Sequence, residues 1–367
     1  MSDHAKLSPS SASMWMECTP SAMLNANVKD ETSEYALEGT SAHALAEHKV
    51  NKALHRDTQD PRENLDFYNE EMDEYTDGYC QLVEEKAKDA DLVEVEKRLD
   101  LGDFIPGGFG TADCLVIKGD KLSIIDLKYG TGVLVSAESN AQLMCYAAGA
   151  VMEYSHLFDI KTVELIIYQP RREHFSAWEI SADELIAWAR DILRPRALLA
   201  IKGEGDFAPS ETTCRWCKVK DTCRARAEFY LELAREEFKP PAELDDSEIA
   251  EVLSKVDGLV AWATDVKDYA TGQALSGVKY DGFKLVEGRS VRKYTDDEAV
   301  AEAVTNAGYD PYEKKVKGIT AMSKLLGKKF DDILGHYVAK PPGKPVLVPN
   351  TDKRKEITTA LDDFKED

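Results

Sequence analysis

The sequence has no apolar run that approaches the roughly 18 residues a membrane-spanning helix needs. Its first segment, Met1 to Cys18, lacks a basic stretch followed by an apolar one, so we expect no secretory signal. Neither an internal repeat nor a low-complexity segment is present. These absences favour a globular protein of the cytosol, where cysteines stay reduced and serve as metal ligands more often than as disulfides.

Basic residues are scarce relative to acidic ones: 46 lysines and arginines stand against 68 aspartates and glutamates, a net charge of −22. So large a negative net charge disfavours binding of nucleic acid over the whole protein surface. A run of lysines between Lys314 and Lys355 qualifies that exclusion, because a local basic surface can bind phosphates. A solvated helix face and tail explains the same run equally well.

The 367 residues, 43% of them hydrophobic, suffice for one large decorated domain or two domains. The patterns predict strands over 92–101, 110–118, 121–129 and 163–168, and helices over 42–50, 66–88, 137–154, 181–201, 224–237 and 245–276. Thr40-Ser41 and Ser181 are expected to cap two of these helices. We therefore predict an α/β core followed by a helical, mixed C-terminal region.

Two aspartates are predicted to oppose each other across a hairpin. Gly119-Asp120 is a two-residue turn signal, and it pairs Lys118 with Lys121, and hence Asp113 with Asp126. Directly opposed residues share a face, with Cβ atoms roughly 5 Å apart, and like charges there destabilise a sheet. Lys128, two residues beyond Asp126, lies on that same face. A cation between the carboxylates would relieve the repulsion, so the pattern predicts a metal site.

The chemistry of such a site follows from its oxygen ligands. Mg²⁺ and similar hard cations bind one or two carboxylates, with waters and substrate phosphate completing the shell. Asp113 and Asp126 supply the carboxylates, and the Leu127 backbone carbonyl is a further candidate ligand. Lys128 could lower the pKa of an attacking water or neutralise charge that builds up in a phosphorane-like transition state.

Three further residues are candidates for the metal site, and ordinary structural roles are the alternative explanation. His43 and Glu47 stand four residues apart on one predicted helix face, so the histidine could complete the metal shell. Taken alone, His43 is more often a packed or surface histidine. Glu96, on the strand before Asp113, could join the edge of the site, but a solvated strand position is the more frequent outcome.

The segments Glu38–Glu47, Gly110–Asp113, Ile124–Gly130 and Gln142–Tyr146 together resemble the PD-(D/E)XK nuclease superfamily. The branch they resemble is the RecB/AddB-like one with its phage and prophage members, although the Pro-Asp dipeptide is absent here. The resemblance implies a restriction-endonuclease-like core with a mixed central sheet flanked by helices. It implies metal ligands and a catalytic lysine at His43, Asp113, Asp126 and Lys128, and a DNA-positioning pair at Gln142 and Tyr146.

Three cysteines fall in one short loop, Cys214, Cys217 and Cys223, and a closed site needs a fourth ligand, for which Cys18 is the best candidate. This one-plus-three arrangement resembles the iron–sulfur staple of AddB-type and CRISPR-adaptation nucleases, which implies a [4Fe–4S] cluster. Structural Zn²⁺ in the same thiolates is the alternative. The remaining three cysteines, Cys80, Cys114 and Cys145, are predicted to be small core residues.

We therefore expect a nuclease core over 1–235 and an accessory region over 236–367 that binds DNA or a partner. The expected activity is Mg²⁺- or Mn²⁺-dependent hydrolysis of DNA, as an exonuclease of phage or prophage recombination or DNA processing in the bacterial cytoplasm. Expected partners are DNA and recombination proteins such as single-strand-binding or annealing proteins. The competing hypothesis is a DNA-binding or assembly subunit that keeps the nuclease scaffold and has little turnover of its own.

Overall fold

The structure is a computed structural model that describes residues 5–29, 33–236, 246–286, 296–312 and 316–339. The contacts divide the chain into two compact units, Met1–Gln273 and Ala274–Asp367. The predicted functional division after residue 235 stays a prediction. Most of the predicted lysine run, including Lys314, Lys344 and Lys355, lies outside the described residues. None of the described helices combines the length and hydropathy of a membrane span.

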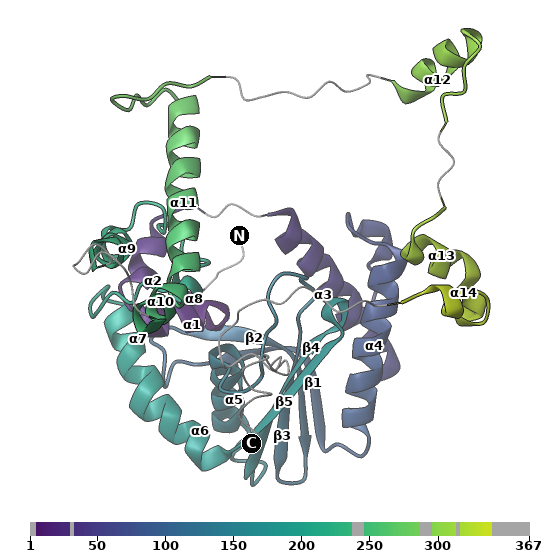
Figure 1. Ribbon diagram of the computed structural model, residues 1–367. Helices are drawn as coiled ribbons and strands as arrows, with labels where there is room; N and C mark the ends of the chain where they lie inside the picture. The colour runs from purple at the N-terminus through teal and green to yellow at the C-terminus, as the bar shows by residue number, and fades with distance from the viewer. Residues whose placement is uncertain (1–4, 30–32, 237–245, 287–295, 313–315, 340–367) are drawn as a thin grey trace, which may run out of the picture. The chain divides into compact units, whose positions relative to one another are not determined.

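The first unit is built on one mixed five-stranded sheet in the order β1-β2-β3-β4-β5 (Figure 1). Its strands are β1 (Leu92–Asp100), β2 (Phe109–Lys118), β3 (Lys121–Leu127), β4 (Thr162–Gln169) and β5 (His174–Ser181). Neighbouring strands are antiparallel except for β3 and β4, which are parallel and joined through a helix. The α/β prediction with a helical C-terminal part is confirmed. The strand β5 was not predicted.

The helices of the first unit cover both faces of this sheet (Figure 1). On one face α5 (Ala141–Tyr154) packs on the larger apolar core, while α3 (Glu34–Ala53) and α4 (Glu70–Ala87) pack on the other. The remaining helices of this unit are η1 (Pro9–Ser11), α1 (Ala12–Glu17), α2 (Ser21–Ala26), η2 (Arg62–Asn64), η3 (Pro170–Arg172), α6 (Ala182–Trp188), the π-helical turn η4 (Ala189–Leu193), α7 (Arg194–Ala200), α8 (Glu211–Cys214), α9 (Arg224–Glu236), α10 (Asp246–Leu253) and α11 (Val256–Leu275).

In the described residues of the second unit, all regular secondary structure is helical. They are α12 (Asp297–Asn306), α13 (Ile319–Leu326), η5 (Gly327–Lys329), α14 (Phe330–Leu334) and η6 (Gly335–Tyr337). The helix α12 begins where the Asp296 carboxylate accepts hydrogen bonds from two backbone N–H groups of its first turn.

Of the two predicted helix caps, one is confirmed and the other is wrong. Ser181 caps α6 in a reciprocal capping box with Glu184, as predicted. The predicted cap at Thr40-Ser41 is wrong, because α3 already begins at Glu34 after a cap by Ser33. The Thr40 hydroxyl instead donates to the Ala36 carbonyl within the helix. The helix therefore carries His43 in its middle rather than in its first turn.

Candidate metal centre

The predicted hairpin register is confirmed at every pair that the two strands form. Lys118 pairs with Lys121 around the Gly119-Asp120 turn, and the ladder ends at Cys114 opposite Ile125. The ladder thus stops one pair short of Asp113 and Asp126, the pair that the sequence predicted. The Asp113 carboxylate there accepts a hydrogen bond from the Leu127 N–H at 2.8 Å. The middle of β2 and the C-terminal end of β3 are thus joined through an acidic side chain.

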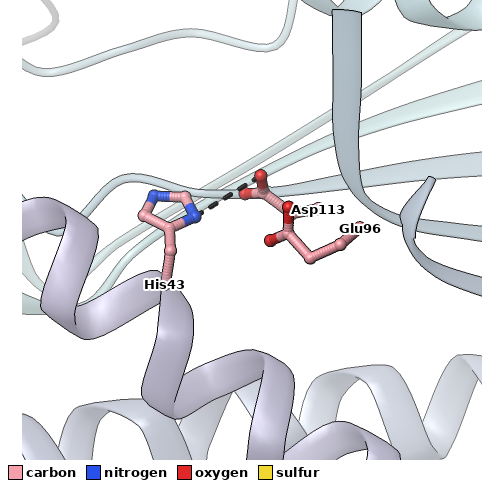
Figure 2. A group of neighbouring side chains, drawn as sticks. All are labelled: His43, Glu96 and Asp113. Carbon is pink, nitrogen blue, oxygen red and sulfur yellow. Dashed lines mark ion pairs between the residues drawn. The ribbon is translucent and has the colours of Figure 1, made fainter. Parts of the chain in front are cut away.

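Three side chains from three elements meet at this end of the sheet. Among the described residues, His43, Glu96 and Asp113 form the group whose candidate ligand atoms all lie within 4.8 Å of one another. Figure 2 shows the imidazole of His43 pointing from α3 toward the Asp113 carboxylate, with the Glu96 carboxylate beside it. His43 Nδ1 lies 3.4 Å from Asp113 Oδ1. An imidazole nitrogen and two carboxylates are a donor set that fits a divalent cation.

Glu96 reaches this group through an unusual backbone conformation. The pairs on either side, Val95 with Cys114 and Lys97 with Ala112, place Glu96 opposite Asp113. Its φ is 48°, in the left-handed region that a non-glycine residue rarely adopts. The expectation that Glu96 is a solvated strand position is therefore wrong. A strained residue inside a strand, beside a cluster of ligand-type side chains, is typical of a functional site.

The carboxylates in this group repel one another, and this repulsion and the burial of the site shift the pKa values of its side chains. Burial, together with the nearby Asp113 charge, raises the pKa of Glu96 to about 7. Burial also works against the charged form of Asp113, but His43, Lys128 and the Leu127 N–H outweigh it and lower the pKa of that carboxyl. Burial opposes a charged His43 too, yet Asp113 raises its pKa to about 9. The site therefore concentrates negative charge that a cation would compensate.

Lys128 is held at the end of a second chain of contacts. Its Nζ lies 2.9 Å from Asp126 Oδ2 and donates to Gln142 Oε1 at 2.9 Å. Gln142 Nε2 in turn donates to the Tyr146 hydroxyl at 3.2 Å. Gln142 and Tyr146 both come from the first turns of α5, which Asn140 caps. In this structure the two α5 residues therefore hold the lysine.

Asp126 is the most buried acid of the site, with 2% of its surface exposed. Burial raises its pKa to about 6, with the Asp113 charge acting in the same direction against the opposing pull of Lys128. Its Oδ2 is buried and receives no hydrogen bond of good geometry from the described residues, although Lys128 Nζ is close. A buried carboxylate oxygen that lacks a hydrogen bond is available as a ligand.

The structure thus groups the predicted residues in two clusters. His43 and Asp113 stand with Glu96, and Asp126 stands with Lys128, Gln142 and Tyr146. The ligand roles of Asp126 and of the Leu127 carbonyl stay predictions. Glu47 is exposed on α3, one turn beyond His43. The register of β1 on β2 was the signal that could have identified Glu96, because it sets this residue opposite Asp113.

The four candidate cluster cysteines line one cavity, but they do not form a closed metal site. Cys18, Cys214, Cys217 and Cys223 line this cavity together with apolar residues such as Phe207 and Val219. Among the described residues, these sulfur atoms form no group within 4.8 Å of one another. Asn25 connects α2 to this loop, because its amide donates to Cys217 Sγ at 3.5 Å. The predicted core cysteines Cys80, Cys114 and Cys145 are buried, as expected.

Comparison with known proteins places residues 4–355 in one family, described as "Protein of unknown function (DUF2800)". Among solved structures, the chain is similar to one described as "Crystal structure of SSO0001". That match has 14% sequence identity and a TM-score of 0.23, and covers 58% of this chain and 96% of the other. A likeness this weak supports no functional conclusion, so the geometry of the site is the basis for the function.

Proposed function

We propose that this chain, which belongs to the DUF2800 family, is a metal-dependent nuclease that hydrolyses phosphodiester bonds in DNA. The observation that supports the proposal best is the meeting of His43, Glu96 and Asp113 at the sheet end that also carries Asp126 and Lys128. The arrangement of a hairpin with Asp113, Asp126 and Lys128 resembles the PD-(D/E)XK superfamily, which favours an exonuclease of phage or prophage recombination in the bacterial cytoplasm. DNA recombination proteins are the partners this role requires.

The ligand set fits Mg²⁺ or Mn²⁺. Carboxylates suit both ions, and the imidazole of His43 favours the transition metal Mn²⁺. Asp126 Oδ2, which receives no hydrogen bond of good geometry but lies 2.9 Å from Lys128 Nζ, could complete the set from the β3 side. When bound, such an ion polarises the phosphate and lowers the pKa of a water molecule.

The chain's own residues supply the remaining chemistry. Lys128 presents an ammonium group, and although burial disfavours its charge, Asp126 and Asp113 raise its pKa. A fixed cation at this position stabilises negative charge that develops on the phosphate during attack by water. Gln142 orients that ammonium group through the 2.9 Å hydrogen bond, so the lysine is positioned before substrate arrives.

The test is incubation of end-labelled linear DNA with the protein and Mn²⁺. Wild type should degrade the substrate, whereas Asp126→Ala and Lys128→Ala should leave it intact. Intact DNA with wild type, or equal cleavage by either variant, rejects the proposal. A mobility shift in EDTA without turnover in Mn²⁺ would favour a DNA-binding subunit instead.

For the cysteine cavity we propose a [4Fe–4S] cluster. Four sulfurs around one tetrahedral Zn²⁺ at about 2.3 Å would lie about 3.8 Å apart. Among the described residues these sulfurs form no group within 4.8 Å of one another, and a cluster of four irons and four sulfides spaces its thiolates further apart than a single ion does. The apolar lining also suits a cluster, since it limits solvent access. Cys18 would tie the end of α1 to the loop of the other three.

A further inference from the structure

The loop that follows Lys128 carries two exposed aliphatic side chains at its tip. Residues 129–140 connect β3 to α5, and the tip from Gly130 to Leu134 is exposed. Val133 retains 43% and Leu134 52% of its surface. Six residues of extended chain span at most about 21 Å, so the backbone of both residues lies within that distance of Lys128. The loop begins at the site, because Lys128 Nζ contacts Asp126 and the Lys128 N–H donates to the Tyr168 carbonyl of β4 at 2.9 Å.

Side chains from β4 and η3 hold this loop in place. Gln169, only 2% exposed, donates through Nε2 to the carbonyls of Gly130 and Val133, each at 2.9 Å. Its Oε1 accepts from the Val135 N–H at 3.2 Å. Arg172 donates to the Thr131 carbonyl at 2.7 Å. The loop backbone is thus bound by a buried amide and a cation rather than by a ladder of its own.

Strand β5 adds two more contacts at the base of the same loop. A ring nitrogen of His174 lies 2.9 Å from the Val135 carbonyl oxygen, and the Ser176 hydroxyl accepts from the Ala137 N–H at 3.0 Å. A loop fixed at this many points keeps its tip in one position. Exposed apolar side chains on a fixed loop are preorganised for contact, because little freedom remains to be lost on binding.

We infer that Val133 and Leu134 form a contact surface for the bases of a nucleic-acid strand whose phosphate lies at the metal centre. This inference rests on the proposed function. Aliphatic side chains commonly insert against or between base steps in protein–DNA complexes. Two side chains are too small for a stable protein interface, which takes about 800 Å² from each partner. Arg172 at the base of the loop adds a positive charge for the strand's phosphates.

The experiment measures binding of a fluorescein-labelled duplex oligonucleotide by anisotropy in Ca²⁺, which takes oxygen ligands as Mg²⁺ does. The variant V133S/L134S should bind about tenfold more weakly than wild type, because two aliphatic contacts are lost. Leu157→Ser is the matched control, since Leu157 is 64% exposed beyond the far end of α5. It should bind as wild type does.

A second variant tests the loop's fixation. Gln169→Leu keeps both aliphatic side chains but removes three hydrogen bonds to the loop, so it should also bind more weakly. Equal binding by V133S/L134S and wild type, an equal loss in Leu157→Ser, or no binding by wild type overturns the inference.

Hydrolysis of the small diester bis(p-nitrophenyl) phosphate in Mn²⁺ separates the two proposals. This substrate has no bases, so V133S/L134S should match wild type. A loss of this activity in the double variant would overturn the inference, because the damage would then lie at the metal centre. Failure of wild type to cleave both this ester and DNA rejects the nuclease proposal, while the binding comparison still decides the role of the loop.

Discussion

At the residue scale, Lys128 is the side chain on which the proposed chemistry depends most. It is held by Asp126 and Gln142 and lies two residues beyond the buried acid. Replacing Lys128 with Ala should lower the rate of DNA hydrolysis by about a hundredfold or more, because a preorganised charge at the phosphate is removed. The measurement is degradation of end-labelled DNA at saturating Mn²⁺.

The matched control for that variant is Lys161→Ala. Lys161 is an exposed lysine next to the Gly119-Asp120 turn, since its N–H donates to the Asp120 carbonyl, and it therefore lies at the opposite end of the strands. This control should keep the wild-type rate. Equal rates for wild type and Lys128→Ala would remove the lysine from the mechanism.

Gln142 is a positioning residue in this structure, because it touches Lys128 and Tyr146. Its replacement by Leu should lower kcat by about tenfold with little change in KM, since the lysine is then less well oriented. Tyr146→Phe should have a smaller effect, because it removes only the hydrogen bond that Gln142 donates to the Tyr146 hydroxyl. If Gln142→Leu raised KM and left kcat unchanged, the residue would bind the DNA strand instead, as the superfamily resemblance implies.

At the element scale, α3 carries His43 and is fixed to α4 by ion pairs. Lys49 is 8% exposed, and its Nζ lies 3.0 Å from Asp73 Oδ1 and 2.5 Å from Asp77 Oδ1. Burial opposes a charged Asp73, but Lys49 and Arg62 outweigh it and lower its pKa. The stabilisation by Asp73 is therefore present above the unfolded pKa of about 4 and is lost as pH falls through the folded value.

Asp73→Asn should accordingly lower the free energy of unfolding by about 1 kcal/mol at pH 7. The gap in Tm between variant and wild type should narrow as the pH falls below about 4, because wild type then loses the same charge. Glu74→Gln, an exposed acid on the same helix, is the control. A gap that stays constant from pH 7 to pH 3 would contradict the ion-pair account.

The cysteine loop and the N-terminal helices form the second element-scale test. Anaerobically purified protein should be brown, with a broad visible absorption band, and Cys18→Ser should weaken the band and lower the Tm, because α1 loses its tie to the loop. Cys145→Ser is the control for a buried cysteine away from the cavity. A colourless protein with stoichiometric zinc would reject the iron–sulfur proposal.

Local chemistry explains which elements the sequence could predict. The Gly-Asp turn between two apolar, β-rich runs defines the hairpin, and hence the register that leads toward Asp113 and Asp126. Strand β5 was not predicted; it follows η3 directly, after Glu173 with a φ of 48°. The left-handed backbone of Glu96, with a φ of 48°, has no signal in the local sequence, so only the pairing of β1 with β2 sets this residue opposite Asp113.

At the scale of the whole molecule, the net charge and the charge of the candidate site have the same sign. The chain carries a net charge of −22, and its candidate centre is itself acidic, with Glu96 and Asp113 in one group. Attraction of a DNA strand by the general field of the protein is therefore not expected. Binding must come from a cation at the centre, from Lys128 and from contacts near it, so affinity should depend on divalent metal.

The direct test of this account is a calorimetric titration of the protein with Mn²⁺. Wild type should bind, and Glu96→Gln should bind about ten- to a hundredfold more weakly, because one carboxylate of the group is lost. Glu34→Gln, an exposed acid at the start of the helix that carries His43, should bind as wild type does. Absence of Mn²⁺ binding by wild type, or equal affinity for wild type and Glu96→Gln, would contradict a metal centre at His43, Glu96 and Asp113.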